Sequence, residues 1–216
     1  MDQVLEELKA GILHFQNEIY PPNAEKYKKA VSEPQQPSTL IVTCADSRID
    51  PELITQSGPG EIFVTRNIGN LVPAYGEMLG GVSAVIEYAV SALKVKHVAI
   101  CGHSDCGAMK ALLDPGSLES LGSVKNWMRN AEAAMNVTDS LAPANESPLD
   151  RLKRLTEENV LLQLQHLRTH PSVAGAIARK ELTLSGWVYD IGAGQVRIAE
   201  NGEREFHPVR QESHNG

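Results

Sequence analysis

The chain has 216 residues, of which 42% are hydrophobic and 22% are charged. These proportions are those of an ordinary globular protein, so we expect one folded domain over residues 1–216 rather than a disordered or fibrous chain. The count of 20 Lys and Arg against 27 Asp and Glu leaves a net charge of −7. A net anion is poorly suited to nucleic acid or an anionic membrane, and neither is expected as the main partner.

Three features of the sequence bear on the compartment. Apolar runs are all shorter than the roughly 18 residues that a membrane-spanning helix needs. The stretch from Met1 to Glu7 is acidic, where a signal or transit peptide carries basic residues. Three cysteines are too few, and odd in number, for a disulfide framework. We therefore expect a cytoplasmic protein with free thiols and no membrane span.

The first half of the chain begins with a predicted amphipathic helix, ended by Pro21-Pro22 and forming an N-terminal arm over residues 1–30. Its apolar residues recur at steps of three and four: Leu5, Leu8, Ile12, Phe15 and Ile19. They pack either on the chain's own core or on a partner subunit. Short, β-branched, apolar stretches predict buried strands over residues 39–44 and 61–66. An apolar helical face follows over residues 82–93.

In the second half, a third strand is expected over residues 97–101, closed by Gly102, and helices over 106–113 and 118–134. Ser147, Pro148 and Asp150 have the pattern of a helix start, and Pro171 begins another helix through about residue 180. Residues 187–190 and 195–199 form a predicted hairpin, and a loose tail or partner-binding arm follows about His207. Strands that alternate with helices indicate an α/β fold with four parallel strands, an antiparallel edge strand and flanking helices.

Unusual side chains follow two of the predicted strands. Cys44 ends the first strand, and the third is followed by His103 and Cys106. Because ligands bind beyond the carboxyl ends of strands in an open α/β sheet, these three side chains converge if the two strands are neighbours. Two thiolates and one imidazole are the donors of a zinc site with an open fourth position. Cys101 lies inside the apolar strand and is expected in the core.

Asp46 and Arg48 lie just beyond Cys44. Asp46 can take the fourth zinc position, which closes the site. Alternatively Arg48, whose planar guanidinium can grip a carboxylate with two hydrogen bonds, can hold Asp46 away and leave the position to water. A third interpretation is a plain turn ion pair without a catalytic role. The residues alone leave these alternatives open.

The combined pattern of Cys44, Asp46, Arg48, His103 and Cys106 resembles that of the β-class carbonic anhydrases. The similarity continues through residues 61–70 and 81–88, is dense over 35–109, and is weaker at 186–189. It implies a fold with one Zn²⁺ per chain on Cys44, His103 and Cys106, and a catalytic Asp46–Arg48 pair that controls the fourth position. The implied activity is the reversible hydration of CO₂ to bicarbonate and a proton, by attack of zinc-bound hydroxide.

The resemblance also implies a substrate pocket. Gln35, Phe63 and Tyr88 correspond to the pocket residues of the plant-like, open-site members, and Gln35 with the Gly107 N–H is expected to bind the substrate oxygens. The family's other type has a tryptophan where this chain has Ile41, although Arg66 and Tyr189 match other residues of its bicarbonate pocket. We therefore expect the open type.

In related enzymes the three pocket side chains reach the zinc across a dimer interface, and the N-terminal helix packs on the partner. A homodimer or a larger homo-oligomer is therefore expected. Two other functions remain open. The same fold and metal can hydrolyse carbonyl sulfide or carbon disulfide, or the chain can be a zinc-stabilised, bicarbonate-sensing module in which Asp46 stays on the metal.

Overall fold

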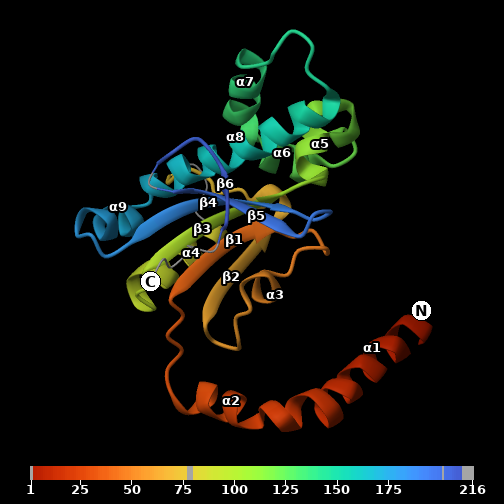
Figure 1. The fold of residues 1–216 in the computed structure, drawn as a ribbon, viewed down its shortest axis with the longest axis vertical. Helices are drawn as coiled ribbons and strands as arrows, with labels where there is room; N and C mark the ends of the chain where they lie inside the picture. The colour runs from red at the N-terminus through yellow and green to blue at the C-terminus, as the bar shows by residue number, and fades with distance from the viewer. Residues whose placement is uncertain (1, 77–79, 201, 211–216) are drawn as a thin grey trace.

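A six-stranded sheet organises the computed structural model, which describes residues 2–76, 80–200 and 202–210 (Figure 1). The strand order is β2-β1-β3-β4-β5-β6. The strands are β1 (Thr39–Cys44), β2 (Ile62–Asn67), β3 (His97–His103), β4 (Thr183–Asp190), β5 (Gln195–Glu200) and β6 (His207–Pro208). Strands β2, β1, β3 and β4 are parallel, whereas β5 and β6 are antiparallel. The expected α/β fold is confirmed, with β6 as an additional short strand. Residues 211–216 of the expected tail lie outside the described residues.

The main core lies on one face of the sheet, where some of the helices cover it. The helices are α1 (Asp2–His14), α2 (Tyr20–Ser32), α3 (Pro51–Thr55), α4 (Gly81–Glu87), α5 (Gly107–Leu113), α6 (Gly122–Met128), α7 (Glu132–Ser140), α8 (Pro148–Thr169) and α9 (Pro171–Ala178). Because side chains alternate along a strand, Leu40 and Ile100 face α4, α8 and α9. Ile41, Ala99 and Cys101 point to the other face, where Trp187 and Tyr189 pack on them. Cys101 is thus buried, as expected.

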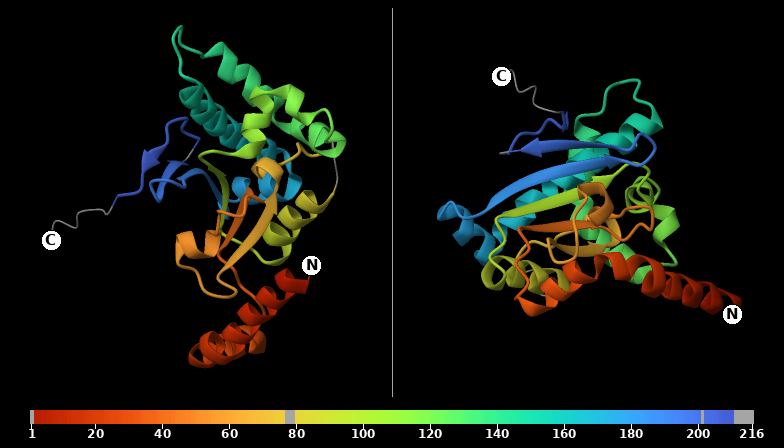
Figure 2. Two further views of the ribbon diagram at one scale, coloured as in Figure 1. Left: turned by 90° about the vertical axis from the view of Figure 1, so that its right-hand side faces the viewer. Right: turned by 60° about the horizontal axis from the view of Figure 1, so that its bottom comes forward.

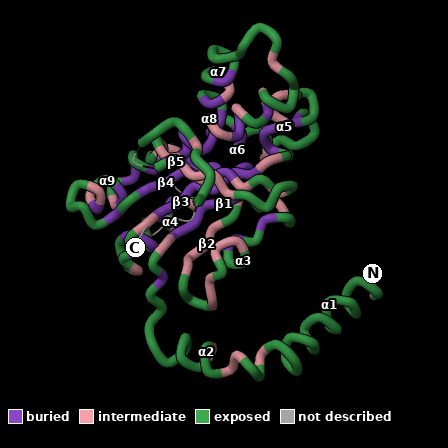
Figure 3. The backbone as a smooth tube through the Cα atoms, in the orientation of Figure 1, coloured by how far each residue is buried: buried purple, intermediate pink, exposed green. Residues whose placement is uncertain are grey.

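The helix of the N-terminal arm does not end where the sequence pattern predicts. Helix α1 continues through a π-helical turn, Phe15–Ile19, into α2, so the helix does not end at Pro21-Pro22. Both prolines fall in the first turn of α2, directly after the π-helical turn. The arm extends away from the sheet and is exposed along most of its length (Figures 2 and 3). Leu8 and Ile12 are 61% and 56% exposed, so the chain's own core does not cover them.

The helix expected over residues 118–134 is interrupted. The segment contains α6, a 3₁₀ turn at Arg129–Ala131 and the start of α7. Leu121 and Ala131 have backbone angles outside the helical region, with φ of −116° at both residues. The bends let Met128 and Ala134 pack into one cluster around Cys106, so tertiary packing overrides the helical pattern.

Strand β3 extends two residues beyond its predicted end and includes Gly102. A Cβ atom at Gly102 would lie 2.8 Å from Cγ2 of Val160 on α8. The glycine therefore allows close packing of a helix on the strand rather than a turn. The predicted start of α8 is confirmed, because Ser147 Oγ accepts a hydrogen bond from the Asp150 N–H at 3.1 Å. Among the described residues, no helix is long and apolar enough to cross a membrane.

Candidate metal centre

Three side chains meet at the carboxyl ends of β1 and β3. The two strands are parallel neighbours, with Thr43 beside Cys101 in the register, so residues that end them lie at the same edge of the sheet. The Sγ atoms of Cys44 and Cys106 and a ring nitrogen of His103 all lie within 4.8 Å of one another. All three residues are buried. The convergence predicted for them is therefore present.

His103 presents a free nitrogen to this cluster. Its Nδ1 lies 2.9 Å from the Ser104 carbonyl oxygen, and because a carbonyl only accepts, Nδ1 carries the proton. In the neutral ring Nε2 then carries the free lone pair, and it is buried without a hydrogen-bond partner. A buried orphan nitrogen beside two thiols is costly unless a cation binds it. Two sulfurs and one imidazole nitrogen fit Zn²⁺ and its tetrahedral preference.

The two thiols of the cluster differ in acidity. The Cys106 thiol hydrogen-bonds to Cys44 and lowers the pKa of Cys44 to about 4, although burial opposes this. The same contact, together with burial, raises the pKa of Cys106. Cys101 is different, because burial raises its pKa to about 12. Burial therefore keeps Cys101 as an inert, protonated thiol in the core.

Asp46 borders the cluster and is held by Arg48. Its Oδ2 lies 3.9 Å from Nε2 of His103. Arg48 donates from Nε to Oδ1 at 2.9 Å and from Nη2 to Oδ2 at 2.7 Å, so both carboxylate oxygens are engaged. These hydrogen bonds hold the pKa of Asp46 well below its usual range and raise that of Arg48. The bidentate pair expected from the sequence is present, with Asp46 ionised.

Arg48 has a second carboxylate partner that the sequence analysis did not identify. Its Nη1 donates to Asp105 Oδ2 at 3.0 Å, and Lys110 pairs with the other oxygen of Asp105. The hydrogen bond from Lys110 and, to a smaller extent, the one from Arg48 lower the pKa of the Asp105 carboxyl group. The one hint of this contact in the sequence is that an acidic residue lies between the two candidate ligands His103 and Cys106.

Arg66 fixes the backbone of the segment that carries Cys44 and Asp46. Its Nε donates to the Cys44 carbonyl at 3.1 Å, and its Nη2 donates to the Asp46 carbonyl at 2.6 Å. The guanidinium is therefore engaged with backbone oxygens. Ile41, at the position where one type of the family carries tryptophan, is 1% exposed and packs with Ala99 and Cys101.

The four expected substrate-binding residues fall into two groups. Gly107 begins α5, next to Cys106, and no atom lies within 4 Å of the place where its Cβ would be. Gln35, by contrast, precedes β1, whose far end carries Cys44. Phe63 pairs with Leu40 near the start of β1, and its ring centroid lies 6.1 Å from that of Tyr88. Gln35, Phe63 and Tyr88 are thus not beside the cluster of their own chain.

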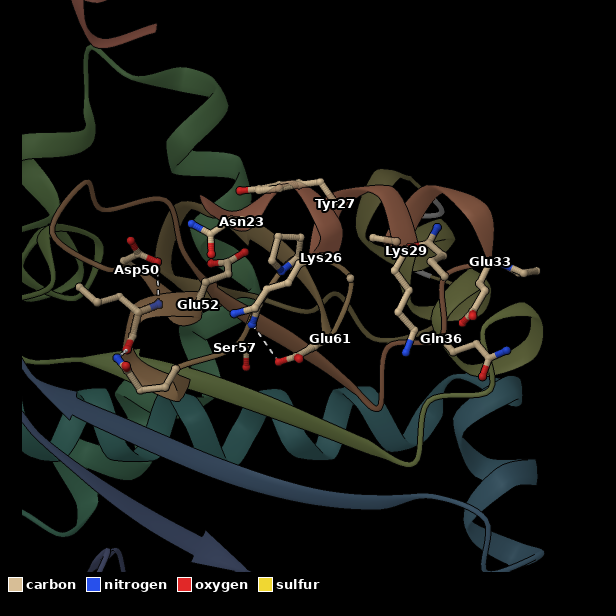
Figure 4. A pocket seen from close by; sticks show the side chains of 18 residues that line it. Asn23, Lys26, Tyr27, Lys29, Glu33, Gln36, Asp50, Glu52, Ser57 and Glu61 are labelled. Carbon is tan, nitrogen blue, oxygen red and sulfur yellow. Dashed lines mark hydrogen bonds between the residues drawn. The ribbon is translucent and has the colours of Figure 1, made fainter. Parts of the chain in front are cut away.

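A pocket of about 910 Å³ separates the arm from the body of the protein (Figure 4). Lys26 and Lys29 of α2 line one side, and Glu52 and Glu61 line the other. Gln35 belongs to its lining, whereas the Cys–His–Cys cluster does not. The pocket is therefore the space under the arm, and the metal chemistry lies elsewhere.

A buried Cys–His–Cys centre at the carboxyl edge of a parallel sheet is the arrangement of a thiolate–imidazole metalloprotein. Comparisons with known proteins specify the family. The family model for carbonic anhydrase matches residues 39–196. A carbonic anhydrase of Pseudomonas aeruginosa is 45% identical over 196 residues, which are 91% of this chain and 88% of that protein.

Solved structures agree with the sequence comparison. The β-carbonic anhydrase CcaA is 36% identical, with a TM-score of 0.91 over 97% of this chain and 93% of its own. A tetrameric β-carbonic anhydrase of Sordaria macrospora is 32% identical, with a TM-score of 0.73 over 94% of this chain and 95% of its own. The chain belongs to the carbonic anhydrase family, in its β class. It is a zinc enzyme that catalyses the reversible hydration of CO₂.

Proposed function

We propose that CO₂ hydration takes place at the cluster of Cys44, His103 and Cys106, which together hold one Zn²⁺ per chain. The orphan, buried Nε2 of His103 beside two thiols carries this proposal. Because His103 donates from Nδ1 to the Ser104 carbonyl, its Nε2 lone pair is oriented toward the cluster. Zinc, when bound, lowers the pKa of water and so supplies a nucleophile at neutral pH.

Asp46 and Arg48 are the catalytic pair in this proposal. Asp46 is ionised and acts as a hydrogen-bond acceptor at the edge of the cluster, where it orients the nucleophile's proton. Arg48 keeps both carboxylate oxygens occupied and so keeps Asp46 from closing the site. Two observations favour the open type of the family at neutral pH. Arg66 is committed to backbone carbonyls, and Ile41 occupies the position of the other type's tryptophan.

In this proposal, residues of two copies of the chain form each substrate pocket. Gly107 begins α5 beside Cys106, so its N–H is placed to bind a substrate oxygen as negative charge develops on it. Ile49 is 1% exposed and adds an apolar wall. Gln35, Phe63 and Tyr88 stand at the other end of the sheet and reach the zinc of a second copy. Tyr88 is 49% exposed, which leaves its ring accessible to that copy.

A homo-oligomer with a homodimer as its unit follows from this assignment. The arm over residues 1–30, in a single domain spanning 1–216, supplies an apolar surface for the partner. Leu5, Leu8 and Ile12 are each more than half exposed on α1. The exposed apolar area of an arm that leaves the body is typical of an interface between subunits. We place the enzyme in the cytoplasm, where three unpaired thiols remain reduced.

Replacement of the pair tests the proposal. Arg48→Ala frees Asp46 to move toward the zinc, so CO₂ hydration at neutral pH is expected to fall by about 10- to 100-fold, as for partners of metal ligands. The double variant Asp46→Ala/Arg48→Ala removes the blocking carboxylate and is expected to recover part of the activity. Unchanged hydration in Arg48→Ala, at equal zinc content, contradicts the role given to the pair.

A further inference from the structure

We infer that Asp105, supported by Lys110, is a positioning residue that fixes Arg48 on Asp46. This inference rests on the proposed role of the Asp46–Arg48 pair and adds a second carboxylate to it. Asp46 and Arg48 follow β1, whereas Asp105 follows β3. The contact between Arg48 and Asp105 therefore joins the two segments that carry the candidate zinc ligands.

The hydrogen bonds of Arg48 divide its guanidinium between the two segments. Nε and Nη2 donate to Asp46 at 2.9 and 2.7 Å. Nη1 donates to Asp105 Oδ2 at 3.0 Å, and Nη2 also reaches the Asp105 carbonyl at 3.3 Å. All three nitrogens are thus used, and the plane of the group is set by both carboxylates. If Asp46 were its only partner, the Arg48 guanidinium would be bonded only to its own segment, because Asp46 is two residues away.

Asp105 is itself held from the opposite side. Lys110 pairs with Oδ1, while Arg48 binds Oδ2. Lys110 lies one helical turn after Cys106, with its N–H bonded to the Cys106 carbonyl at 3.0 Å. The backbone of Asp105 is left-handed, with φ of 60°, a conformation that most side chains disfavour but that aspartate and asparagine tolerate.

Stability alone does not account for this arrangement. The side chains of Arg48, Asp105 and Lys110 are 45%, 53% and 51% exposed. Ion pairs this exposed add little to folding. Their effect is instead on geometry, because Asp46 Oδ2 lies only 3.9 Å from His103 Nε2. A small displacement of Arg48 releases the carboxylate next to the metal centre.

Azide binding to the cobalt(II)-substituted enzyme tests the inference. Cobalt gives a visible spectrum that changes when an anion binds, so the titration reports access to the metal without measuring turnover. Asp105→Asn keeps the side chain's shape and tolerates the left-handed backbone. If Asp105 positions Arg48, this variant releases Asp46 to compete with azide and weakens azide binding by about threefold. Loss of a negative charge alone acts in the opposite direction and strengthens it.

The same substitution in an Asp46→Ala background separates positioning from every other effect. Without Asp46 there is no carboxylate to release, so Asp105→Asn is expected not to weaken azide binding in that background. Asp114→Asn is the matched control, because it removes the same charge at the other end of α5, where Asp114 bonds Ser117 through its carbonyl. It is expected to bind azide as the unmodified enzyme does.

The outcomes distinguish the inference from the function on which it rests. The inference is overturned if Asp105→Asn leaves azide affinity unchanged or strengthens it, or if it weakens binding equally with and without Asp46. If Asp46→Ala alone does not alter azide affinity, the proposed role of Asp46 at the metal is wrong, and the inference falls with it. A weakening that occurs only when Asp46 is present supports both.

Discussion

Cys44 and Phe63 stand on neighbouring strands but toward opposite ends of them. In the parallel register Cys44 pairs with Asn67, whereas Phe63 pairs with Leu40. Phe63 precedes Asn67 by four positions, which corresponds to about 13 Å along the sheet. Phe63 therefore cannot line the zinc site of its own chain, and a pocket that uses it needs a second copy.

Mixed oligomers test this division of the site. Cys44→Ala removes a zinc ligand and Phe63→Ala removes the pocket wall, so each variant alone is expected to lose most CO₂ hydration. When the two chains are co-expressed, mixed dimers contain one site with both residues intact, and activity is expected to rise well above either variant. Stopped-flow hydration of the purified mixture measures this. A mixture no more active than its parents would place Phe63 and Cys44 in one chain's site.

Zinc retention distinguishes the three cysteines. Cys44→Ser and Cys106→Ser each remove one of two sulfur donors, and we expect the zinc content per chain to drop to a small fraction of normal. Cys101→Ser is the control, because Cys101 is buried on the sheet face with Ile41 and Ala99, away from the cluster. It is expected to keep its zinc. Elemental analysis after gel filtration gives the counts, and full zinc in Cys44→Ser would refute the assigned ligands.

The close packing of β3 on α8 predicts a stability effect at Gly102. Gly102→Ala places a methyl group 2.8 Å from Val160 Cγ2 and is expected to lower the free energy of unfolding by about 1–3 kcal/mol. Val160→Ala removes the obstructing methyl, so the double variant is expected to lose less than the two single losses added together. Urea denaturation measures all three. Gly122→Ala, where nothing lies within 4 Å, is the control.

His97 predicts how stability depends on pH. Burial lowers the pKa of His97, although Glu200 opposes this. Thr183 Oγ1 donates to the Lys96 carbonyl at 3.3 Å, so it accepts from His97 Nδ1 at 2.7 Å. His97 Nε2 is then left to accept from the Ser185 hydroxyl at 2.7 Å. Protonation of Nε2 removes that acceptor, and the folded state therefore favours the neutral ring.

The sign of the effect follows from this preference. Above the ordinary histidine pKa of about 6.5, the ring is neutral in both states and the contribution of His97 is complete. As the pH falls below 6.5, the unfolded chain binds a proton first, so stability decreases until the folded-state pKa is reached. His97→Gln is expected to flatten the decrease between pH 7 and pH 5, with His14→Gln in the exposed arm as the control. An identical slope in His97→Gln would show that His97 does not contribute.

The parts of the fold and site that the sequence predicted depend on local patterns. Cys44 and His103 can be placed together from the sequence because each ends a short apolar strand, and parallel neighbours end at one edge. Ser147 can be identified as a cap because its partner is three residues away. The contact between Arg48 and Asp105 joins residues 57 positions apart and has no periodic signal. The passage of the arm through Pro21 depends on a π-helical turn that no residue type specifies.

Stopped-flow CO₂ hydration at pH 7 and pH 9, on enzyme whose zinc has been counted, tests the central claim most directly. If Arg48 holds Asp46 away from the metal as proposed, the site is open at neutral pH, and rapid hydration at pH 7 is expected with about one zinc per chain. Full zinc with hydration only at pH 9 would contradict the account, because Asp46 would then close the site at neutral pH.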